Sequence, residues 1–257
     1  MSSSIEIRDL HVSFGGLEVV RDLSLSAAEG ELVSILGPSG SGKSTTFGVL
    51  TGAVRATSGE VRVGGRPLGD RRDAFAFMPQ KDALLPWRRI VDNLTLGLEV
   101  QGASKKAARE KVKPLIGQFG LDGFERAYPF QLSGGMRQRA ALLRTVVQDR
   151  DVLLLDEPFG ALDALTRADM QRWLEGMRRR FGWTILLITH DVREAVFLSD
   201  RIHVLSPRPA TVVRTVEVDL PHPRTLDAIA DPELARIEAE LLAVLLNTTP
   251  ESHAHAS

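Results

Sequence analysis

The chain has 257 residues, a length that corresponds to roughly one large domain. Hydrophobic residues make up 43% and charged residues 25% of the chain, and the formal net charge is −1. This composition excludes disordered, collagen-like and coiled-coil chains, and it gives no support to a dedicated nucleic-acid-binding protein, which usually has a surplus of basic residues. The sequence has no cysteine, which excludes disulfides, iron–sulfur clusters and thiolate zinc sites.

The sequence shows no segment of its own that would direct the chain into a membrane. Residues 1–10 lack the basic start and the apolar run of a signal peptide. The longest apolar runs, such as Val152–Leu155 and Ile185–Ile188, fall far short of the ~20 residues that span a bilayer. Composition alone therefore predicts a soluble, intracellular, globular protein.

The first third of the chain predicts strands, a glycine-rich loop and a helix. Apolar residues alternate over residues 5–25 around a Gly15-Gly16 turn, which predicts antiparallel strands near a sheet edge. The continuous apolar run Leu32–Leu36 predicts a buried strand that leads into a glycine-rich loop and then a helix. A further hairpin is expected where Val61 and Val63 precede two glycines.

The remainder of the chain predicts a helical block followed by more strands. Over residues 92–147 apolar residues recur at helical spacing, and breakers such as Gly97 and Pro114 divide the segment into short helices. Strands that alternate with helices predict a mostly parallel sheet. The expected later elements are strands at Val152–Leu155, Ile185–Thr189 and Ile202–Leu205, and helices at Ala164–Arg180 and around Pro232–Leu246, the last followed by a disordered tail.

Residues Gly37–Ser44 match the pattern G-x-x-x-x-G-K-[ST] between a predicted buried strand and a predicted helix. Glycine lets the backbone curl closely around phosphate oxygens, and the N-terminal N–H groups of the helix point at the same anion. Lys43 is expected to reach the β- and γ-phosphates, and the Ser44 hydroxyl is expected to bind Mg²⁺. The predicted nucleotide-binding residues here are Gly37, Pro38, Ser39, Gly40, Ser41, Gly42, Lys43, Ser44 and Thr45.

A second feature is the apolar run Val152–Leu155, which ends in two carboxylates, Asp156 and Glu157. On a buried parallel strand these carboxylates emerge at the C-terminal end, where α/β sheets bind ligands. Asp156 is expected to hold Mg²⁺, directly or through water, and Glu157 is expected to polarise the attacking water. Together with the phosphate loop, these residues predict a P-loop nucleotide hydrolase.

A third feature is the run Leu132–Arg139, in which Ser133 and two glycines precede an Ala/Leu-rich helical segment. A serine in this place is typical of a helix N-cap. The glycines leave a bare, positive helix end that attracts an anion. The chain therefore has a second predicted phosphate site besides the phosphate loop.

Together these motifs resemble those of the ATP-binding cassette (ABC) ATPases, over nearly the whole chain up to about Pro209. The matches, in the family's order, are Phe14 for adenine stacking, the phosphate loop, Gln80 of the Q-loop, the signature Leu132–Gln138, the Walker B end Asp156-Glu157-Pro158, Asp163 of the D-loop and the switch His190. The resemblance implies an α/β fold with a P-loop NTPase (RecA-like) core, an antiparallel β edge subdomain and an inserted α-helical signature subdomain. The implied division is an ABC ATPase domain over 1–218, with the helical insertion at about 92–147, and a C-terminal helix and flexible tail over 219–257.

The resemblance also implies a head-to-tail homodimer of ATPase subunits with ATP and Mg²⁺ as cofactors. ATP would lie between Lys43 of one subunit and the signature of the other. The implied nucleotide contacts outside the phosphate loop are Phe14, Ser133, Gly134, Gly135 and Asp163, the implied catalytic residues are Lys43, Gln80, Glu157 and His190, and the implied Mg²⁺ ligands are Ser44, Gln80 and Asp156. Two of these residues have a structural interpretation as well: Phe14 could belong to the core, and Asp163 could cap the helix that begins at Ala164 while also serving in the D-loop.

Two further stretches resemble a subgroup of importer ATPases, those for nitrate, sulfonates, taurine and related small anions or thiamine-precursor pyrimidines. They are Leu84-Leu85-Pro86-Trp87 and Leu205-Ser206-Pro207-Arg208-Pro209. Two residues depart from the pattern: Arg150 stands where the family often has Pro, and Ala210 stands where this subgroup often has Gly. The implied partners are transmembrane permease subunits and, indirectly, a periplasmic or lipid-anchored substrate-binding protein. The implied location is the cytoplasmic face of the cell membrane. Trp87 either meets the permease or is a partly buried core residue.

The leading hypothesis is an ATP-hydrolysing, energy-coupling subunit that drives uptake of a small solute through a separate permease. The main alternative is a soluble ABC-type ATPase acting on nucleic acid or the ribosome. Residues 46–132, between the phosphate loop and the signature serine, are too few for the coiled-coil insertion of such proteins, and the near-neutral charge argues against a nucleic-acid partner. A GTPase would need an Asn-Lys-x-Asp motif, which the sequence lacks, a small-molecule kinase would need a lid with an acceptor site, and neither would need the signature. A non-hydrolysing scaffold would be expected to lose Lys43 or Glu157, and both are present.

Overall fold

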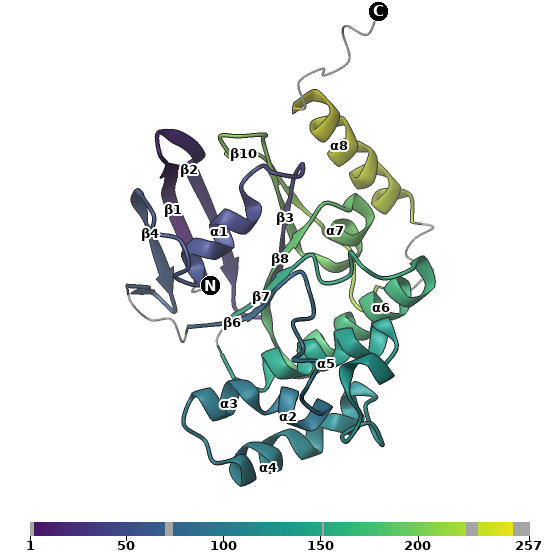
Figure 1. Cartoon of the computed structure of the whole chain (residues 1–257). Helices are drawn as coiled ribbons and strands as arrows, with labels where there is room; N and C mark the ends of the chain where they lie inside the picture. Colours follow the sequence, from purple (N-terminus) through teal and green to yellow (C-terminus); the bar gives the residue numbers. More distant parts are fainter. Residues whose placement is uncertain (1–2, 70–73, 151, 225–230, 249–257) are drawn as a thin grey trace, which may run out of the picture.

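The computed structural model describes residues 3–69, 74–150, 152–224 and 231–248, and it contains two sheets with helices packed around them (Figure 1). The first sheet is antiparallel and has the strand order β2-β1-β4-β5. Its strands are β1 (Ser3–Phe14), β2 (Leu17–Ala28), β4 (Ser58–Val63) and β5 (Arg66–Pro67). The predicted hairpins are confirmed, and their strands form a sheet of their own.

The second sheet has the strand order β10-β9-β3-β8-β7-β6. Its strands are β3 (Leu32–Leu36), β6 (Phe75–Met78), β7 (Val152–Asp156), β8 (Thr184–Thr189), β9 (Arg201–Leu205) and β10 (Val212–Glu217). All neighbouring pairs are parallel except β9 and β10, which are antiparallel. The predicted parallel sheet is confirmed, but the sequence reasoning missed the edge strands β6 and β10.

Helix α1 (Lys43–Leu50) lies between the two sheets, directly after the phosphate loop (Figure 1). Its buried residues Phe47 and Leu50 belong to the same apolar core as Val12 and Leu23 of the first sheet and Ile35 of the second. This core fixes the start of α1 relative to both sheets, and it therefore fixes the loop that precedes the helix.

A block of short helices gathers at one end of the molecule, next to β6 and β7 (Figure 1). It contains α2 (Ile90–Leu94), α3 (Leu96–Val100), α4 (Lys105–Ile116), 3₁₀ turns at Gly117–Phe119 and Pro129–Gln131, and α5 (Gly134–Val146). The prediction that Gly97 and Pro114 end helices is wrong, because they lie inside α3 and α4. Pro114 is tolerated near the end of α4 because the carbonyl it leaves without a donor belongs to the exposed Glu110, where water can replace the helical bond.

Three further helices complete the described fold: the long helices α6 (Ala164–Phe181) and α8 (Pro232–Thr248), and the short helix α7 (Val192–Leu198). Helix α8 packs against α7 through Leu234, Ile237 and Leu241, each of which is buried and contributes about 2 kcal/mol by removing apolar surface from water. The predicted helices at 164–180 and 232–246 are confirmed, and the predicted disordered tail lies outside the described residues. Within the described ranges, no helix combines the length and hydrophobicity that crossing a bilayer requires.

A charged cluster ties the segment before α8 to the core. His222 Nδ1 lies 2.5 Å from Glu175 Oε1 on α6, and His222 Nε2 lies 2.9 Å from Oδ1 of Asp200, the residue just before β9. Because a carboxylate only accepts hydrogen bonds, both ring nitrogens must donate, which requires the charged imidazolium. The hydrogen bond to Asp200, followed by that to Glu175, raises the pKa of His222 above its ordinary value. Nearby, the buried Arg224 guanidinium donates to five backbone carbonyls of residues 196–220.

We predict that this cluster makes stability depend on pH. Because the folded state raises the pKa of His222, its contribution is complete below the unfolded pKa of about 6.5 and is lost as the pH rises through the folded value. A His222→Gln variant should lose on the order of 2 kcal/mol at low pH, and the deficit should shrink as the pH rises. Urea unfolding of both proteins across this range measures the difference; a deficit that stays constant with pH contradicts the prediction.

Candidate functional site

The phosphate loop leaves the C-terminal end of β3, a fully buried strand between β8 and β9. Two of its glycines adopt the left-handed backbone region, with φ of 76° at Gly40 and 123° at Gly42. A Cβ atom at Gly42 would stand 3.0 Å from the carbonyl oxygen of Val19 on β2. Glycine is therefore required where the loop turns into α1, because the first sheet approaches the backbone closely at this point.

Lys43 is buried and folds back over the loop. Its Nζ donates to the carbonyl oxygens of Gly37 at 2.7 Å and Pro38 at 2.9 Å. Burial lowers the pKa of Lys43, and the neighbouring Glu157 and Asp156 oppose that shift. The Ser41 hydroxyl oxygen is also buried and has no hydrogen-bond partner among the described residues. A buried ammonium and an orphaned hydroxyl in one cradle fit an anionic ligand such as a phosphate group.

Asp156 ends β7 and lies close to Ser44 at the start of α1. Burial raises the pKa of Asp156, as does the neighbouring Glu157, whereas a hydrogen bond from Ser44 and the charge of Lys43 lower it. A bound cation would relieve the cost of burying this carboxylate. The described residues hold no group of three or more acidic, His or Cys side chains able to bind a metal. The donor set fits Mg²⁺, which takes one or two protein oxygens and completes its shell with phosphate and water.

Gln80, Glu157 and His190 follow β6, β7 and β8, which are adjacent strands of the second sheet. Gln80 Nε2 donates to Glu157 Oε2 at 2.9 Å, and His190 Nδ1 lies 3.2 Å from the same oxygen. The Glu157 backbone has a φ of 45°, and its N–H donates to the carbonyl of Ile188 at 2.9 Å. A φ in this left-handed backbone region costs a non-glycine residue about 1 kcal/mol or more, and residues with such strained backbones cluster at functional sites. Three strand ends thus hold one carboxylate in a fixed position.

The signature residues lie on the exposed N-terminal end of α5. Ser133 is the N-cap, because its side chain accepts from the N–H of Met136 at 3.2 Å. A Cβ atom at Gly135 would stand 2.8 Å from the side chain of Thr166 on α6, so the glycine allows α5 to approach the D-loop segment. Asp163 caps α6 by accepting from the N–H of Thr166 at 3.1 Å, which confirms the N-cap alternative for this residue.

Two aromatic residues with open alternatives lie at the surface. Phe14 at the end of β1 is 50% exposed, and Trp87 before α2 is 72% exposed. The core alternatives for both residues are therefore wrong. Each presents a large apolar surface for which the folded chain provides no cover, and this is the condition that a stacking or docking role requires.

The sequence reasoning missed the residues that brace the phosphate loop from behind. The Arg208 Nε donates to the carbonyl oxygen of Gly40. The Ala210 N–H donates to the Val19 carbonyl at 2.9 Å, and the Ala210 side chain lies beside Gly42. The run Leu205–Pro209 was a signal for this contact, but sequence alone gave it no position next to the loop.

The fold and this site define a P-loop nucleotide hydrolase, and comparison with known proteins narrows the class. The ABC transporter family model matches residues 20–160. An aliphatic sulfonates import ATP-binding protein of Xanthomonas axonopodis pv. citri is 43% identical over 245 residues, which is 95% of this chain and 80% of that protein. A taurine import ATP-binding protein of Yersinia pestis bv. Antiqua is 40% identical over 215 residues, which is 84% of each.

A solved structure agrees with these relatives. It is described as the dimeric structure of a bacterial ABC transporter cassette, and it has a TM-score of 0.72 and 28% identity over 84% of this chain and 99% of that chain. The chain belongs to the ABC transporter family. The predicted family and the predicted P-loop NTPase fold are confirmed.

Proposed function

We propose that the protein hydrolyses ATP to drive an importer of small solutes that carry a sulfonate group, of the aliphatic sulfonate or taurine type. The observation that carries the proposal is the convergence of Gln80 and His190 on the Glu157 carboxylate, next to a complete phosphate loop. A chain that only bound nucleotide would not need three strand ends arranged around one carboxylate. The two importer relatives support the solute class, which this subunit would serve without touching the solute.

In this proposal each residue acts on the γ-phosphate or its surroundings. Lys43 would transfer its hydrogen bonds from the loop carbonyls to phosphate oxygens. Ser44 and Asp156, with Gln80 as a further ligand, would hold Mg²⁺, which neutralises charge on the phosphates. Glu157 would orient the attacking water and accept its proton, while Gln80 and His190 keep the carboxylate in place.

The working unit in this proposal is a head-to-tail homodimer. Ser133 is exposed at the positive end of α5 and its side chain caps its own helix, whereas Gly135 is the signature residue that packs against Thr166 of α6. The exposed face of Ser133 would therefore meet a partner's nucleotide. Phe14 would stack on adenine from the first sheet. Residues 1–218 would form the ATPase domain, with the helical insertion at about 92–147, and residues 219–257 would be an appended segment.

The remaining partners are transmembrane permease subunits, which would place the protein on the cytoplasmic face of the membrane. Trp87 supports this, because it is exposed beside Arg88 and Arg89 at the entrance to the helical block. A substrate-binding protein outside the membrane would act indirectly. A net charge of −1 supports a protein partner over nucleic acid.

Replacing Glu157 by Gln tests the assigned chemistry. Gln has the size of Glu and its side-chain oxygen can still accept hydrogen bonds from Gln80 and His190, but it cannot accept the proton of the attacking water. Turnover should therefore fall by about a hundredfold or more while ATP still binds. With ATP the variant should accumulate as a dimer in size-exclusion chromatography. Turnover near the wild-type rate would show that Glu157 is not the catalytic carboxylate.

Replacing Trp87 by Ala tests the permease surface. Loss of a central interface tryptophan should weaken binding to the purified permease pair by about thirtyfold and leave the ATPase rate of the isolated subunit unchanged. Leu246→Ala, which removes an equally exposed apolar side chain on α8, is the matched control. Equal permease affinity for the Trp87→Ala and Leu246→Ala variants would show that Trp87 is not part of the interface.

A further inference from the structure

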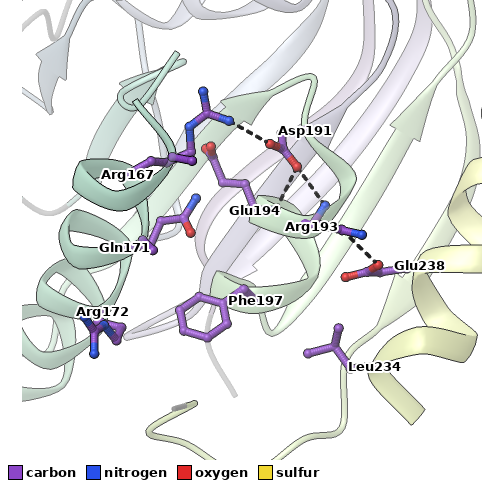
Figure 2. Close-up of a pocket in the computed structure, with 11 residues that line it drawn as sticks. Arg167, Gln171, Arg172, Asp191, Arg193, Glu194, Phe197, Leu234 and Glu238 are labelled. Carbon is purple, nitrogen blue, oxygen red and sulfur yellow. Dashed lines mark hydrogen bonds and ion pairs between the residues drawn. The ribbon is translucent and has the colours of Figure 1, made fainter. Parts of the chain in front are cut away.

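A cavity of about 280 Å³ lies between α6, α7 and α8, away from the phosphate loop (Figure 2). Apolar side chains form much of its wall, including Ala164 and Ala168 of α6, Phe197 of α7 and Leu234 of α8. Charged and polar residues complete the lining. Helix α8 closes one side, so the cavity exists only when the C-terminal helix is packed on the core.

One buried carboxyl group in this cavity has an oxygen atom without a hydrogen-bond partner. Glu194 is only 4% exposed, and its Oε1 atom has no hydrogen-bond partner among the described residues. Burial raises the pKa of Glu194 to about 8, with a further contribution from Asp191, while Thr189, Arg167 and Gln171 oppose the shift. In Figure 2 the side chain extends from α7 toward Arg167 and Gln171 of α6. An unpartnered buried acceptor of this kind marks a place for a donor.

The other charged groups of the lining are already balanced. Arg167 pairs with Asp191 at 3.2 Å, and Arg193 pairs with Glu238 of α8 at 3.6 Å (Figure 2). The third arginine of the lining, Arg172, pairs with Asp169 on its own helix. Glu194 is therefore the one carboxyl group of the described lining without an ion-pair partner. An ammonium group beside Glu194 would balance the ionised form of its carboxyl group, whereas an anion would need a cationic partner, and these arginines already pair with other carboxylates.

We propose that the cavity binds a small primary ammonium compound with a short apolar body, whose ammonium group donates to Oε1 of Glu194. The apolar body would contact Phe197 and Leu234, and the ammonium group would lie between α6 and α7. A compound of this kind supplies the missing donor, and its positive charge stabilises the Glu194 carboxylate once the proton is released. A neutral alcohol of the same shape supplies only the donor.

The position of the cavity gives such a ligand a route to the nucleotide site. Helix α6 begins directly after Asp163 of the D-loop, and α7 begins after Asp191, the residue next to His190. A ligand that contacts both helices would fix the D-loop relative to the switch histidine and change the ATPase rate. This effect on turnover rests on the proposed function, whereas binding to Glu194 does not.

Isothermal titration with n-butylamine, carried out on the full chain, tests the site. At about pH 7 the amine is charged and Glu194 is mostly protonated, so binding should release a proton, seen as a heat that depends on the ionisation enthalpy of the buffer. Glu194→Gln should weaken binding by at least about tenfold and abolish proton release. Glu238→Gln, which alters a carboxylate already paired at the rim, should bind with nearly wild-type affinity.

Three results would overturn the proposal: no binding to the wild-type chain at millimolar amine, equal binding by Glu194→Gln, or equal binding of 1-butanol. Thermal melts show whether Glu194→Gln folds; this variant removes a buried ionisable group and should be at least as stable as wild type. Amine binding without any change in ATPase rate would support the binding site and contradict its proposed effect on turnover. If Glu157→Gln hydrolysed ATP at the wild-type rate, the proposed function would be contradicted, but the interpretation of the amine titration would not change.

Discussion

The position of one carboxylate, that of Glu157, depends on the pairing of three parallel strands. Strands β6, β7 and β8 bring Gln80, Glu157 and His190 to the same edge of the sheet, and two of these side chains meet the third at a single oxygen. The strained backbone of Glu157 is held by a hydrogen bond to β8. A shift of one strand by one residue would point these side chains to opposite faces. Strand register is therefore the constraint on which the chemistry depends.

The phosphate loop is also held in position by the strands around it. It leaves β3 in the centre of the sheet, and the first sheet approaches so closely at Gly42 that no side chain fits there. Arg208 and Ala210 brace the loop from the connection after β9. The loop therefore has a fixed shape before any nucleotide binds, which lowers the entropy cost of binding.

Much of the fold and most residues of the candidate site could be predicted from sequence, because local patterns encode them. The buried strand Leu32–Leu36, the glycine spacing of the loop and the carboxylates after β7 are all continuous in the chain. The short strand β6 was missed, because four residues carry too little periodicity and the strand exists through its pairing with β7. The Arg208 contact, the His222 cluster and the cavity around Glu194 join residues far apart in sequence, so only the folded chain shows them.

The central claim is that each active site combines the phosphate loop of one subunit with the signature of another. Mixing two inactive variants, Lys43→Ala and Ser133→Arg, measures this directly. In a mixed dimer one site receives both defects, and the other receives an intact loop and an intact signature. The ATPase rate of the mixture should therefore rise well above the sum of the rates of the two variants alone. A mixture no more active than that sum would contradict the shared site.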